Sequence, residues 1–217
     1  MKTALIFGSS GLVGTELLKN IIQDDSYDHI KIFVRYVVEN SNSKVEIIQT
    51  DFSNLEKYKD FIVGDDCFFC IGTTRKNTPD KNEYIRIEYN IPVEVAKIAK
   101  LNSVKNFIYV SSLGASSNAT GLYLKNKGKV EEELIKLNFP KLSIIRPSIL
   151  LGKRKEKRVG EKVGVFLMQT LSPLFLGKLK KYKPIKVENV AKAMVNISQN
   201  NYQKVTFESD QLLEISN

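Results

Sequence analysis

The sequence predicts an α/β protein: a doubly wound, Rossmann-like parallel sheet with a small C-terminal substrate cap. Apolar runs alternate with segments of helical spacing through most of the 217 residues. Most of these runs lack the alternation of a half-exposed strand, as expected when helices cover both faces of a sheet. A glycine-rich turn also joins the first run to the first helical segment. Together these features favour right-handed βαβ units and a parallel sheet.

The first half of the chain supplies four predicted strands and two predicted helices. In order, they are a strand at Lys2–Phe7 ended by Gly8, a helix at Leu12–Ile22, strands at Ile30–Val34 and Val45–Gln49, a strand at Asp66–Ile71 ended by Gly72, and a helix at Lys81–Leu101. In both helices the apolar residues recur three to four positions apart and so share one face. Pro92 predicts a kink or a restart within the second helix.

The second half continues the alternation. In order, it has a strand at Asn106–Val110, a helix at Thr120–Leu137, a strand at Leu142–Arg146 before Pro147, a helix at Lys186–Gln199 and a last strand at Lys204–Glu208. No repeat or low-complexity linker interrupts the chain. We therefore expect one dinucleotide-binding domain over residues 1–217, with the sheet built largely from the first 150.

Positive charge is concentrated in one segment. The net charge is +9, and residues 152–186 hold 11 of the 33 Lys and Arg residues but only two acids, Glu156 and Glu161. The remainder of the chain is neutral. We predict that residues 152–186 form a mobile basic cap over the substrate cleft, with an apolar helix at Val163–Gly177, facing an anionic substrate or docking surface. The alternative is a solvated lysine-rich surface.

Several classes of protein are disfavoured. Two cysteines exclude a disulfide scaffold, and Cys67 and Cys70 on one strand point to opposite faces, which argues against a redox pair or metal site. Neither an aromatic ladder nor a recognised module supports nucleic-acid binding. The 15 residues Val163–Gly177 reach roughly 22 Å as a helix, short of a bilayer core of about 30 Å. A cytoplasmic protein without a transmembrane segment is expected.

The glycine-rich turn predicts a dinucleotide site. It consists of Gly8, Ser9, Ser10, Gly11, Leu12, Val13 and Gly14, between the first strand and the first helix. In this arrangement Gly8 permits a tight turn, Gly11 lets a pyrophosphate approach and Gly14 lets helix and strand pack closely. The helix N-terminus offers N–H groups to phosphate. A glycine-rich turn without a ligand is the alternative.

The residues after the next strands predict which dinucleotide binds. Arg35 follows the second strand, where an arginine accommodates the 2′-phosphate of NADP and an acid would bind the ribose of NAD. NADP(H) is therefore favoured, unless Arg35 is only a solvated strand-end residue. Two further groups complete the predicted cofactor site: Asp51 and Phe52 at the adenine edge, and Ile71, Gly72 and Thr73 beside the pyrophosphate and ribose.

A catalytic set is predicted at the same edge. Tyr123 and Lys127 are four residues apart and share one face of a helix. Lys127 can stabilise a deprotonated tyrosine and order a ribose hydroxyl, while Tyr123 exchanges a proton with a substrate oxygen. Ser111 and Ser112 end the fifth strand, where a hydroxyl can hold that oxygen. Alone, a Tyr-x-x-x-Lys pair is equally compatible with an ordinary helix surface.

Together these segments resemble the atypical branch of the short-chain dehydrogenase/reductase superfamily, and specifically the Tat-interacting oxidoreductase family. The likeness extends over GSSGLVG, CFFCIGTTRK, KNFIYVSSLGA, YLKNKGKVE, RPSILLGKRKEKRVGE and PIKVENVAKAM. It implies NADPH binding by Ser10, Gly11, Leu12, Val13, Arg35, Ile71, Gly72, Tyr123, Lys127, Leu150 and Arg158. It also makes Tyr123 the proton donor, Lys127 its partner, and Ser112 rather than Ser111 the catalytic serine.

The sequence departs from this family pattern at two places. Ser112 and Tyr123 are only 11 positions apart, so the loop Gly114–Gly121 is short. This leaves open which substrate the protein takes and whether it turns that substrate over well. Phe7 stands where many relatives have threonine. The function predicted is NADPH-dependent carbonyl reduction of a small molecule, by a monomer or weak homo-oligomer. The alternative is a non-catalytic NADPH sensor that acts through a protein partner.

Overall fold

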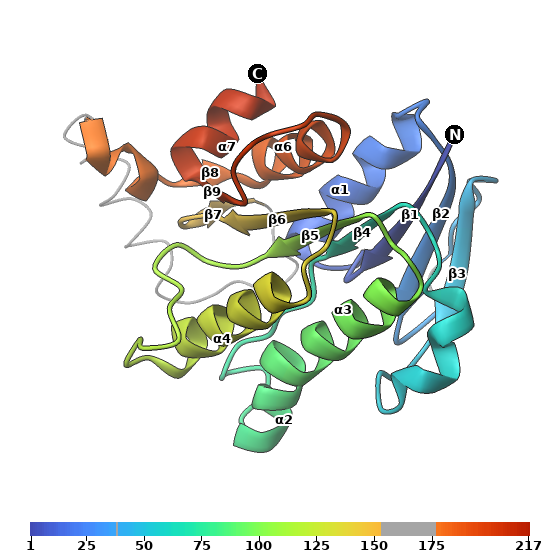
Figure 1. Cartoon of the computed structure of the whole chain (residues 1–217), viewed down its shortest axis with the longest axis horizontal. Helices are drawn as coiled ribbons and strands as arrows, with labels where there is room; N and C mark the ends of the chain where they lie inside the picture. Colours follow the sequence, from blue (N-terminus) through green and yellow to red (C-terminus); the bar gives the residue numbers. More distant parts are fainter. Residues whose placement is uncertain (38, 153–176) are drawn as a thin grey trace.

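The computed structural model describes residues 1–37, 39–152 and 177–217 as a layered α/β fold (Figure 1). Its centre is a parallel sheet with the strand order β3-β2-β1-β4-β5-β6-β9. The strands are β1 (Lys2–Phe7), β2 (Tyr27–Val34), β3 (Val45–Gln49), β4 (Asp66–Phe69), β5 (Asn106–Val110), β6 (Lys141–Arg146) and β9 (Thr206–Glu208). The predicted doubly wound fold is confirmed.

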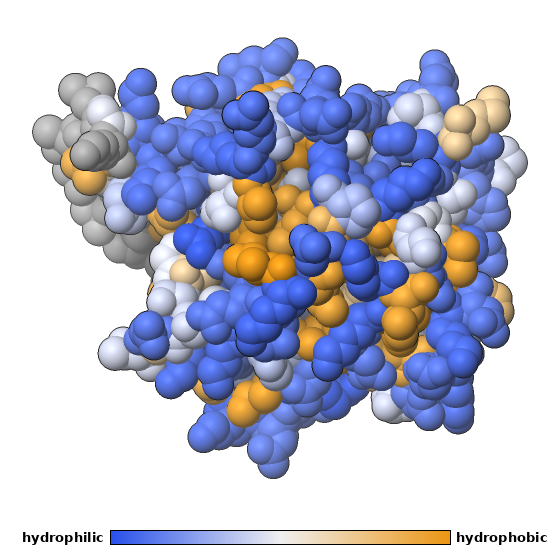
Figure 2. Space-filling view, viewed as in Figure 1, coloured by the Kyte–Doolittle hydropathy of each residue, from blue (hydrophilic) through white to orange (hydrophobic). Residues whose placement is uncertain are grey.

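Helices cover both faces of the sheet and divide the core into two halves. Helices α1 (Leu12–Gln23), α6 (Val187–Gln199) and α7 (Ser209–Ser216) lie on one face, with α1 packed on α6. Helices α3 (Ile91–Leu101) and α4 (Leu122–Lys136) and the short 3-10 helix η1 (Leu55–Phe61) lie on the other. In the view of Figure 2, hydrophobic residues gather where the sheet lies between these layers, and hydrophilic residues surround them.

The order of the strands places a switch point beside β1. From β1 the chain moves outward through β2 and β3, and then returns to β4 on the other side. In such sheets the crevice between diverging connections, at the carboxyl ends of the strands, is where ligands bind. Figure 1 shows the turn after β1 leading into α1 at this position.

Some boundaries differ from those that the sequence predicts. Strand β2 starts at Tyr27 rather than Ile30, and β4 ends at Phe69 because the chain leaves the sheet to line the crevice. A small parallel pair, β7 (Leu150–Leu151) and β8 (Ile185–Lys186), was not predicted, since two residues carry no periodicity. Nor was α7, whose first turn is closed by a capping box between Glu208 and Gln211.

The predicted helix Lys81–Leu101 changes character midway. It consists of α2 (Lys81–Ile85), a π-helical turn, η2 (Arg86–Asn90), and α3. Pro92 lies in the first turn of α3, where its missing N–H removes the helical bond to the carbonyl of residue 88. The N–H of Ile91 instead reaches back five residues to the carbonyl of Arg86. The restart predicted at Pro92 is therefore confirmed, with the irregularity placed just before it.

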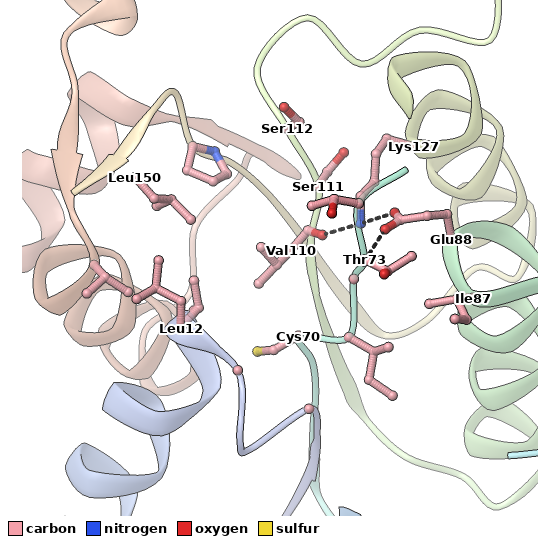
Figure 3. Close-up of a pocket in the computed structure, with 18 of the residues that line it drawn as sticks. Leu12, Cys70, Thr73, Ile87, Glu88, Val110, Ser111, Ser112, Lys127 and Leu150 are labelled. Carbon is pink, nitrogen blue, oxygen red and sulfur yellow. Dashed lines mark hydrogen bonds and ion pairs between the residues drawn. The ribbon is translucent and has the colours of Figure 1, made fainter. Parts of the chain in front are cut away.

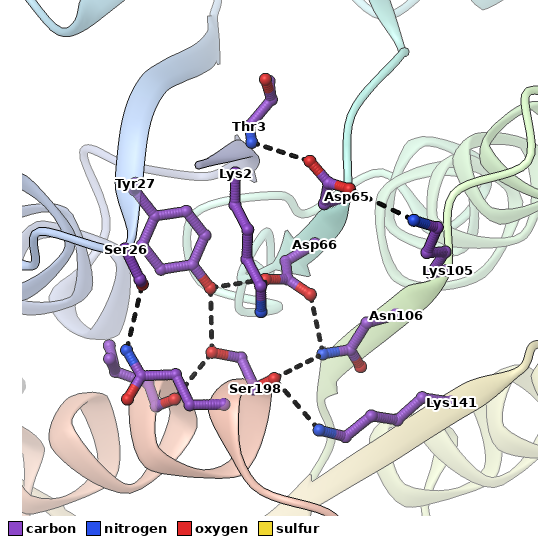
Figure 4. Close-up of polar contacts among 12 residues, drawn as sticks. Lys2, Thr3, Ser26, Tyr27, Asp65, Asp66, Lys105, Asn106, Lys141 and Ser198 are labelled. Atoms are coloured by element: carbon purple, nitrogen blue, oxygen red, sulfur yellow. Dashed lines mark hydrogen bonds and ion pairs between the residues drawn. The ribbon is translucent and has the colours of Figure 1, made fainter.

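A buried polar cluster lies at the amino ends of the strands, on the side of the sheet away from the crevice (Figure 4). Asp66 accepts hydrogen bonds from Tyr27 Oη (2.6 Å) and Asn106 Nδ2 (3.0 Å) and pairs with Lys2 Nζ (3.2 Å). The Tyr27 hydroxyl also meets Ser198 Oγ on α6 at 2.9 Å. One carboxylate thus joins β1, β2, β4 and β5, and the tyrosine extends the network to α6. We expect this cluster to contribute to stability rather than to chemistry.

Within residues 1–37, 39–152 and 177–217, no helix has the length and apolar character needed to span a bilayer.

Candidate functional site

A cleft of about 2010 Å³ opens at the carboxyl ends of the strands. It runs from the turn after β1, past the ends of β2 to β5, to the loop between β6 and β7. Fifteen of the predicted site residues line it: Gly8, Ser10, Gly11, Leu12, Val13, Arg35, Asp51, Phe52, Ile71, Gly72, Thr73, Ser112, Tyr123, Lys127 and Leu150. Residues more than 140 positions apart are therefore brought to one site.

The glycine-rich turn has the geometry that its glycines predict. Gly8 adopts a φ of 88°, and a Cβ there would lie 2.8 Å from the Cys70 carbonyl carbon. A Cβ on Gly14 would lie only 2.0 Å from the Gly8 oxygen, so helix and turn pack in direct contact. Ser9 is buried and its carbonyl accepts from the Thr15 hydroxyl at 3.1 Å. Ser9 and Gly14 thus lie behind the turn and support it, while Ser10 and Gly11 face the cleft.

The N-terminus of α1 is left open for an anion. Its N-cap is Gly11, which provides no side-chain cap, and the first turn contains no acidic residue. The first N–H groups of a helix have no partners within the helix and carry the positive end of its dipole. Facing a cleft, such an end is suited to phosphate.

The end of the cleft beside β2 and β3 is formed by Arg35 and Phe52. Arg35 is exposed at the end of β2. The pKa of the Glu83 carboxyl is lowered chiefly by a hydrogen bond from Arg86, and the nearby charge of Arg35 lowers it further. Phe52 is buried with a φ of 59°, a conformation that a bulky residue adopts only when its surroundings enforce it. Arg86 Nη1 donates to the Phe52 carbonyl at 2.8 Å and fixes this turn.

The predicted catalytic pair is assembled one helical turn apart on α4. Lys127 is buried and its Nζ donates to the Val110 carbonyl at 3.2 Å (Figure 3). The same nitrogen lies 5.9 Å from the centre of the Tyr123 ring, and Tyr123 is 40% exposed in the cleft. Figure 3 also shows Lys127 joined to the carboxylate of Glu88, 3.2 Å away.

The structure separates the roles of the two serines after β5. The Ser111 hydroxyl is buried and donates to Glu131 Oε1 at 2.5 Å, and Glu131 is in turn paired with Arg146. Ser112 Oγ makes only a 3.4 Å contact with the Leu113 carbonyl, and both serines line the cleft. Ser112 is the more exposed of the two, and the hydroxyl of Ser111 is already bound to Glu131.

The short loop Gly114–Gly121 folds directly onto α4. A Cβ on Gly128 would lie 2.1 Å from the Ser116 carbonyl carbon, so this glycine lets the loop backbone cross the helix. The Ser116 N–H donates to the Leu124 carbonyl at 3.2 Å. The loop between Ser112 and Tyr123 can thus be short because its backbone packs directly against the helix that carries Tyr123.

Part of the predicted site lies outside the described residues. Arg158 and most of the basic segment 152–186, including its apolar middle, fall within residues 153–176. In the described part, Lys181 lines the cleft and its Nζ pairs with Glu208 at 3.1 Å. At least this basic side chain therefore has an internal partner.

Sequence reasoning missed Glu88, the carboxylate beside Lys127. Glu88 is 1% exposed, and its Oε1 accepts from the Thr73 N–H at 2.5 Å. The sequence offers one indication of its role: in the predicted helix Lys81–Leu101, Glu88 lies four residues after Tyr84, on the side where apolar residues recur. Arg86 was missed as well, although it lines the cleft.

The cysteines follow the expected pattern. Cys67 packs in the core half beneath α3 and α4, whereas Cys70 packs on the half beneath α1 and α6. Burial raises the pKa of the Cys70 thiol to about 12, so it is protonated at neutral pH. Among the described residues, no group of three His, Cys, Asp or Glu side chains could hold a metal ion.

Comparison with known proteins agrees with this geometry. The NAD(P)H-binding family matches residues 8–201. The chain is 34% identical to the mitochondrial protein FMP52 of Debaryomyces hansenii, over 90% of this chain and 87% of that one. It is 34% identical to the protein HTATIP2 of Rattus norvegicus, over 73% of this chain and 68% of that one. The resemblance inferred from the motifs is confirmed.

Solved structures show the same fold at low identity. A UDP-N-acetylglucosamine 4-epimerase from Methanobrevibacter ruminantium M1 superposes with a TM-score of 0.70 at 14% identity, covering 98% of this chain and 80% of the epimerase. MoeE5 in complex with UDP-glucose and NAD gives a TM-score of 0.67 at 13% identity, covering 99% of this chain and 80% of that one.

The expectation of a cytoplasmic protein is wrong by the same comparison. The similar proteins from Debaryomyces hansenii and Eremothecium gossypii, 34% and 35% identical to this chain, are both named as mitochondrial. An address is read by a receptor and is not a property of the fold, so the apolar pattern used for the fold carried no information about it.

Proposed function

Because this chain belongs to the NAD(P)H-binding family, we propose that it is an NADPH-dependent oxidoreductase that reduces a carbonyl group, with Tyr123 as the acid. The observation that carries this proposal is the meeting of three features in one cleft. These are the open N-terminus of α1, the buried Lys127 beside the exposed Tyr123, and the accessible hydroxyl of Ser112.

The residues present fit a dinucleotide. Gly8 and Gly14 lack the side chains that would close the turn, and the uncapped α1 can receive a pyrophosphate. Ile71, Gly72 and Thr73 would lie along the ribose, and Arg35 with Phe52 would hold the adenine end. When bound, a reduced nicotinamide supplies the hydride for carbonyl reduction.

The remaining steps belong to side chains of this protein. Ser112 holds the substrate oxygen by a hydrogen bond, and Tyr123 Oη gives its proton to that oxygen as the alcohol forms. The neighbouring Lys127 ammonium stabilises the phenolate left behind. Because Tyr123 is 40% exposed, its hydroxyl can regain a proton from solvent after the product leaves.

The substrate end of the cleft bears positive charge. Lys76 is exposed and lines the cleft, and Lys181 lines it as well, paired with Glu208. The exposed Lys76 supports a small carbonyl compound with an anionic group as the substrate. A direct test is mass spectrometry of small molecules retained on purification, followed by a panel of carbonyl compounds with and without a carboxylate. A protein that retains no dinucleotide and does not bind added NADPH would refute the proposal.

Arg35→Asp is expected to weaken NADPH binding about 10- to 150-fold and to affect NADH much less. The reason is loss of a charge-assisted contact to the 2′-phosphate, worth about 1.5–3 kcal/mol. Fluorescence titration of both cofactors with both proteins measures the effect. Lys129→Asp, at an exposed position of α4 away from the cleft, makes the same charge change and should leave both affinities alone. Equal affinity of the unaltered protein for NADH and NADPH would contradict the assignment to NADP(H).

A further inference from the structure

The ion pair between Glu88 and Lys127 is distinguished by its burial. Its side chains are 0% and 5% exposed, whereas every other described ion pair has at least one side chain that is 25% exposed or more. Burying two charges is costly unless they compensate each other and satisfy further hydrogen bonds. Here the Thr73 N–H binds Glu88 Oε1, and the Val110 carbonyl binds Lys127 Nζ (Figure 3).

The local fold places Glu88 at this position. It lies in the π-helical turn η2, which ends just before Pro92. A π-turn contains one extra residue and so changes the direction of the side chains within it, and such turns are frequent at functional sites. The carboxylate is held between the ends of β4 and β5: on one side is Thr73, and on the other is Lys127 with Val110.

Lys127 is enclosed by titratable groups from each element packed on it. They are Cys70 after β4, Tyr84 on α2, Glu88 on η2, Tyr109 on β5 and Tyr123 on α4. Burial alone would lower the pKa of Lys127, but Tyr109 and Glu88 outweigh it and the pKa is raised well above its ordinary value. Burial also raises the pKa of Tyr84 to about 12 and that of Tyr109 further. Glu88 is the one carboxyl group among these five neighbours of Lys127.

We infer that Glu88 is a positioning residue for the proposed reaction, which holds the ammonium of Lys127 charged and in place beneath Tyr123. The inference rests on the proposed function. Lys127 Nζ donates to the Val110 carbonyl, and Glu88 lies beside it as an ion pair at 3.2 Å. Tyr109 also faces this ammonium group, whose three N–H donors are shared among these neighbours and a hydroxyl in the cleft. Without Glu88, the buried lysine would lose its proton more easily and would bind a cleft hydroxyl less well.

The first experiment needs no cofactor and follows the titration of Lys127 itself. Lysines labelled with ¹³C at Cε are observed by NMR between pH 6 and 11, with the Lys127 signal assigned by its loss in Lys127→Met. In the unaltered protein we expect this signal to remain that of a charged lysine throughout. In Glu88→Gln, which keeps an oxygen for the Thr73 N–H, we expect it to titrate at least about two pH units lower, because burial then acts without a counter-charge.

The second experiment measures NADPH affinity against pH. From pH 7 to pH 9.5, Glu88→Gln should lose affinity about tenfold or more relative to the unaltered protein, as the contact from a charged lysine disappears. Glu88→Asp keeps the charge and should largely restore the profile. Glu132→Gln, an exposed carboxylate on α4, is the matched control and should follow the unaltered protein. Lys127→Met should be weaker at all pH values and lack this dependence.

These experiments separate the inference from the proposed function. If the unaltered protein binds no NADPH, the proposed function fails, while the NMR titration still decides the role of Glu88. If NADPH binds and Glu88→Gln shows the same lysine titration and the same pH profile as the unaltered protein, the inference is overturned. Should Glu88→Gln fail to fold, the double variant Glu88→Gln, Lys127→Met should fold, since it leaves no buried charge. A double variant that is also unfolded would overturn the inference.

Discussion

Tyr123→Phe should lower carbonyl turnover about 10²- to 10⁴-fold and leave NADPH affinity nearly unchanged. The phenylalanine ring fills the same space beside Lys127 but has no proton to give to the substrate oxygen. The cofactor contacts assigned to the α1 turn, Arg35 and Phe52 are untouched. Steady-state turnover on the best compound of the carbonyl panel, together with a NADPH titration, measures both quantities.

Tyr202→Phe is the matched control. Tyr202 is 39% exposed, close to the 40% of Tyr123, and lies outside the cleft with its ring edge against Phe207. Loss of the Tyr202 hydroxyl should change neither carbonyl turnover nor NADPH affinity. Equal turnover by Tyr123→Phe and the unaltered protein would exclude the tyrosine as the acid. If both bind NADPH and neither reduces any compound, the binding-only function becomes the better description.

Asp66→Ala is expected to lower the free energy of unfolding by about 3 kcal/mol. The substitution leaves Asn106 Nδ2 with only a 3.4 Å contact to the Ser198 carbonyl and removes the partner of Lys2. Lys2 is one-third exposed, which keeps the loss below that of a fully buried pair. For a chain of this size the change corresponds to a fall of roughly 6–12 °C in melting temperature. Urea unfolding and calorimetry measure it.

The neighbouring Asp65 provides the control for this prediction. It is half-buried, accepts from the Thr3 N–H at 3.0 Å and lies 3.8 Å from Lys105 (Figure 4). Asp65→Asn retains an acceptor for Thr3 and should stay within about 1 kcal/mol, as is usual for an exposed pair. Because the cluster lies at the edge away from the cleft, Asp66→Ala should not alter NADPH affinity in the folded protein. Similar stability losses for the two variants would show that the network contributes little.

The fold was predictable because its determinants are local. Buried parallel strands require continuous apolar runs, and each run from Lys2–Phe7 to Leu142–Arg146 forms a strand within a few residues of its expected bounds. The glycine-rich turn was predictable for the same reason: Gly8 and Gly14 are required by contacts within or near the turn. The general handedness of βαβ units then determines which face of the sheet each connecting helix covers, whereas the strand order was not predicted.

The parts that escaped prediction depend on contacts between distant segments. Glu88 looks like any acid in the pattern of Lys81–Leu101, and its importance comes from Lys127, 39 residues later. The preference for Ser112 over Ser111 came only from the family likeness, because the pairing of Ser111 with Glu131 is not visible in the sequence. The two-residue strands β7 and β8 form because residues 35 apart meet.

The packing of α1 on α6 has a consequence for how the protein is made. Leu17 and Ile21 of α1 share a core with Val190 and Met194 of α6, which leave the ribosome much later. At about 5–20 residues per second, the part of the apolar side of α1 that packs on α6 stays uncovered for roughly 10–35 s during synthesis. A nascent chain of this protein should therefore be a substrate for chaperones until α6 emerges. Ribosome-bound chains halted before residue 187 should be cut by protease within α1, and released full-length chains should be protected there.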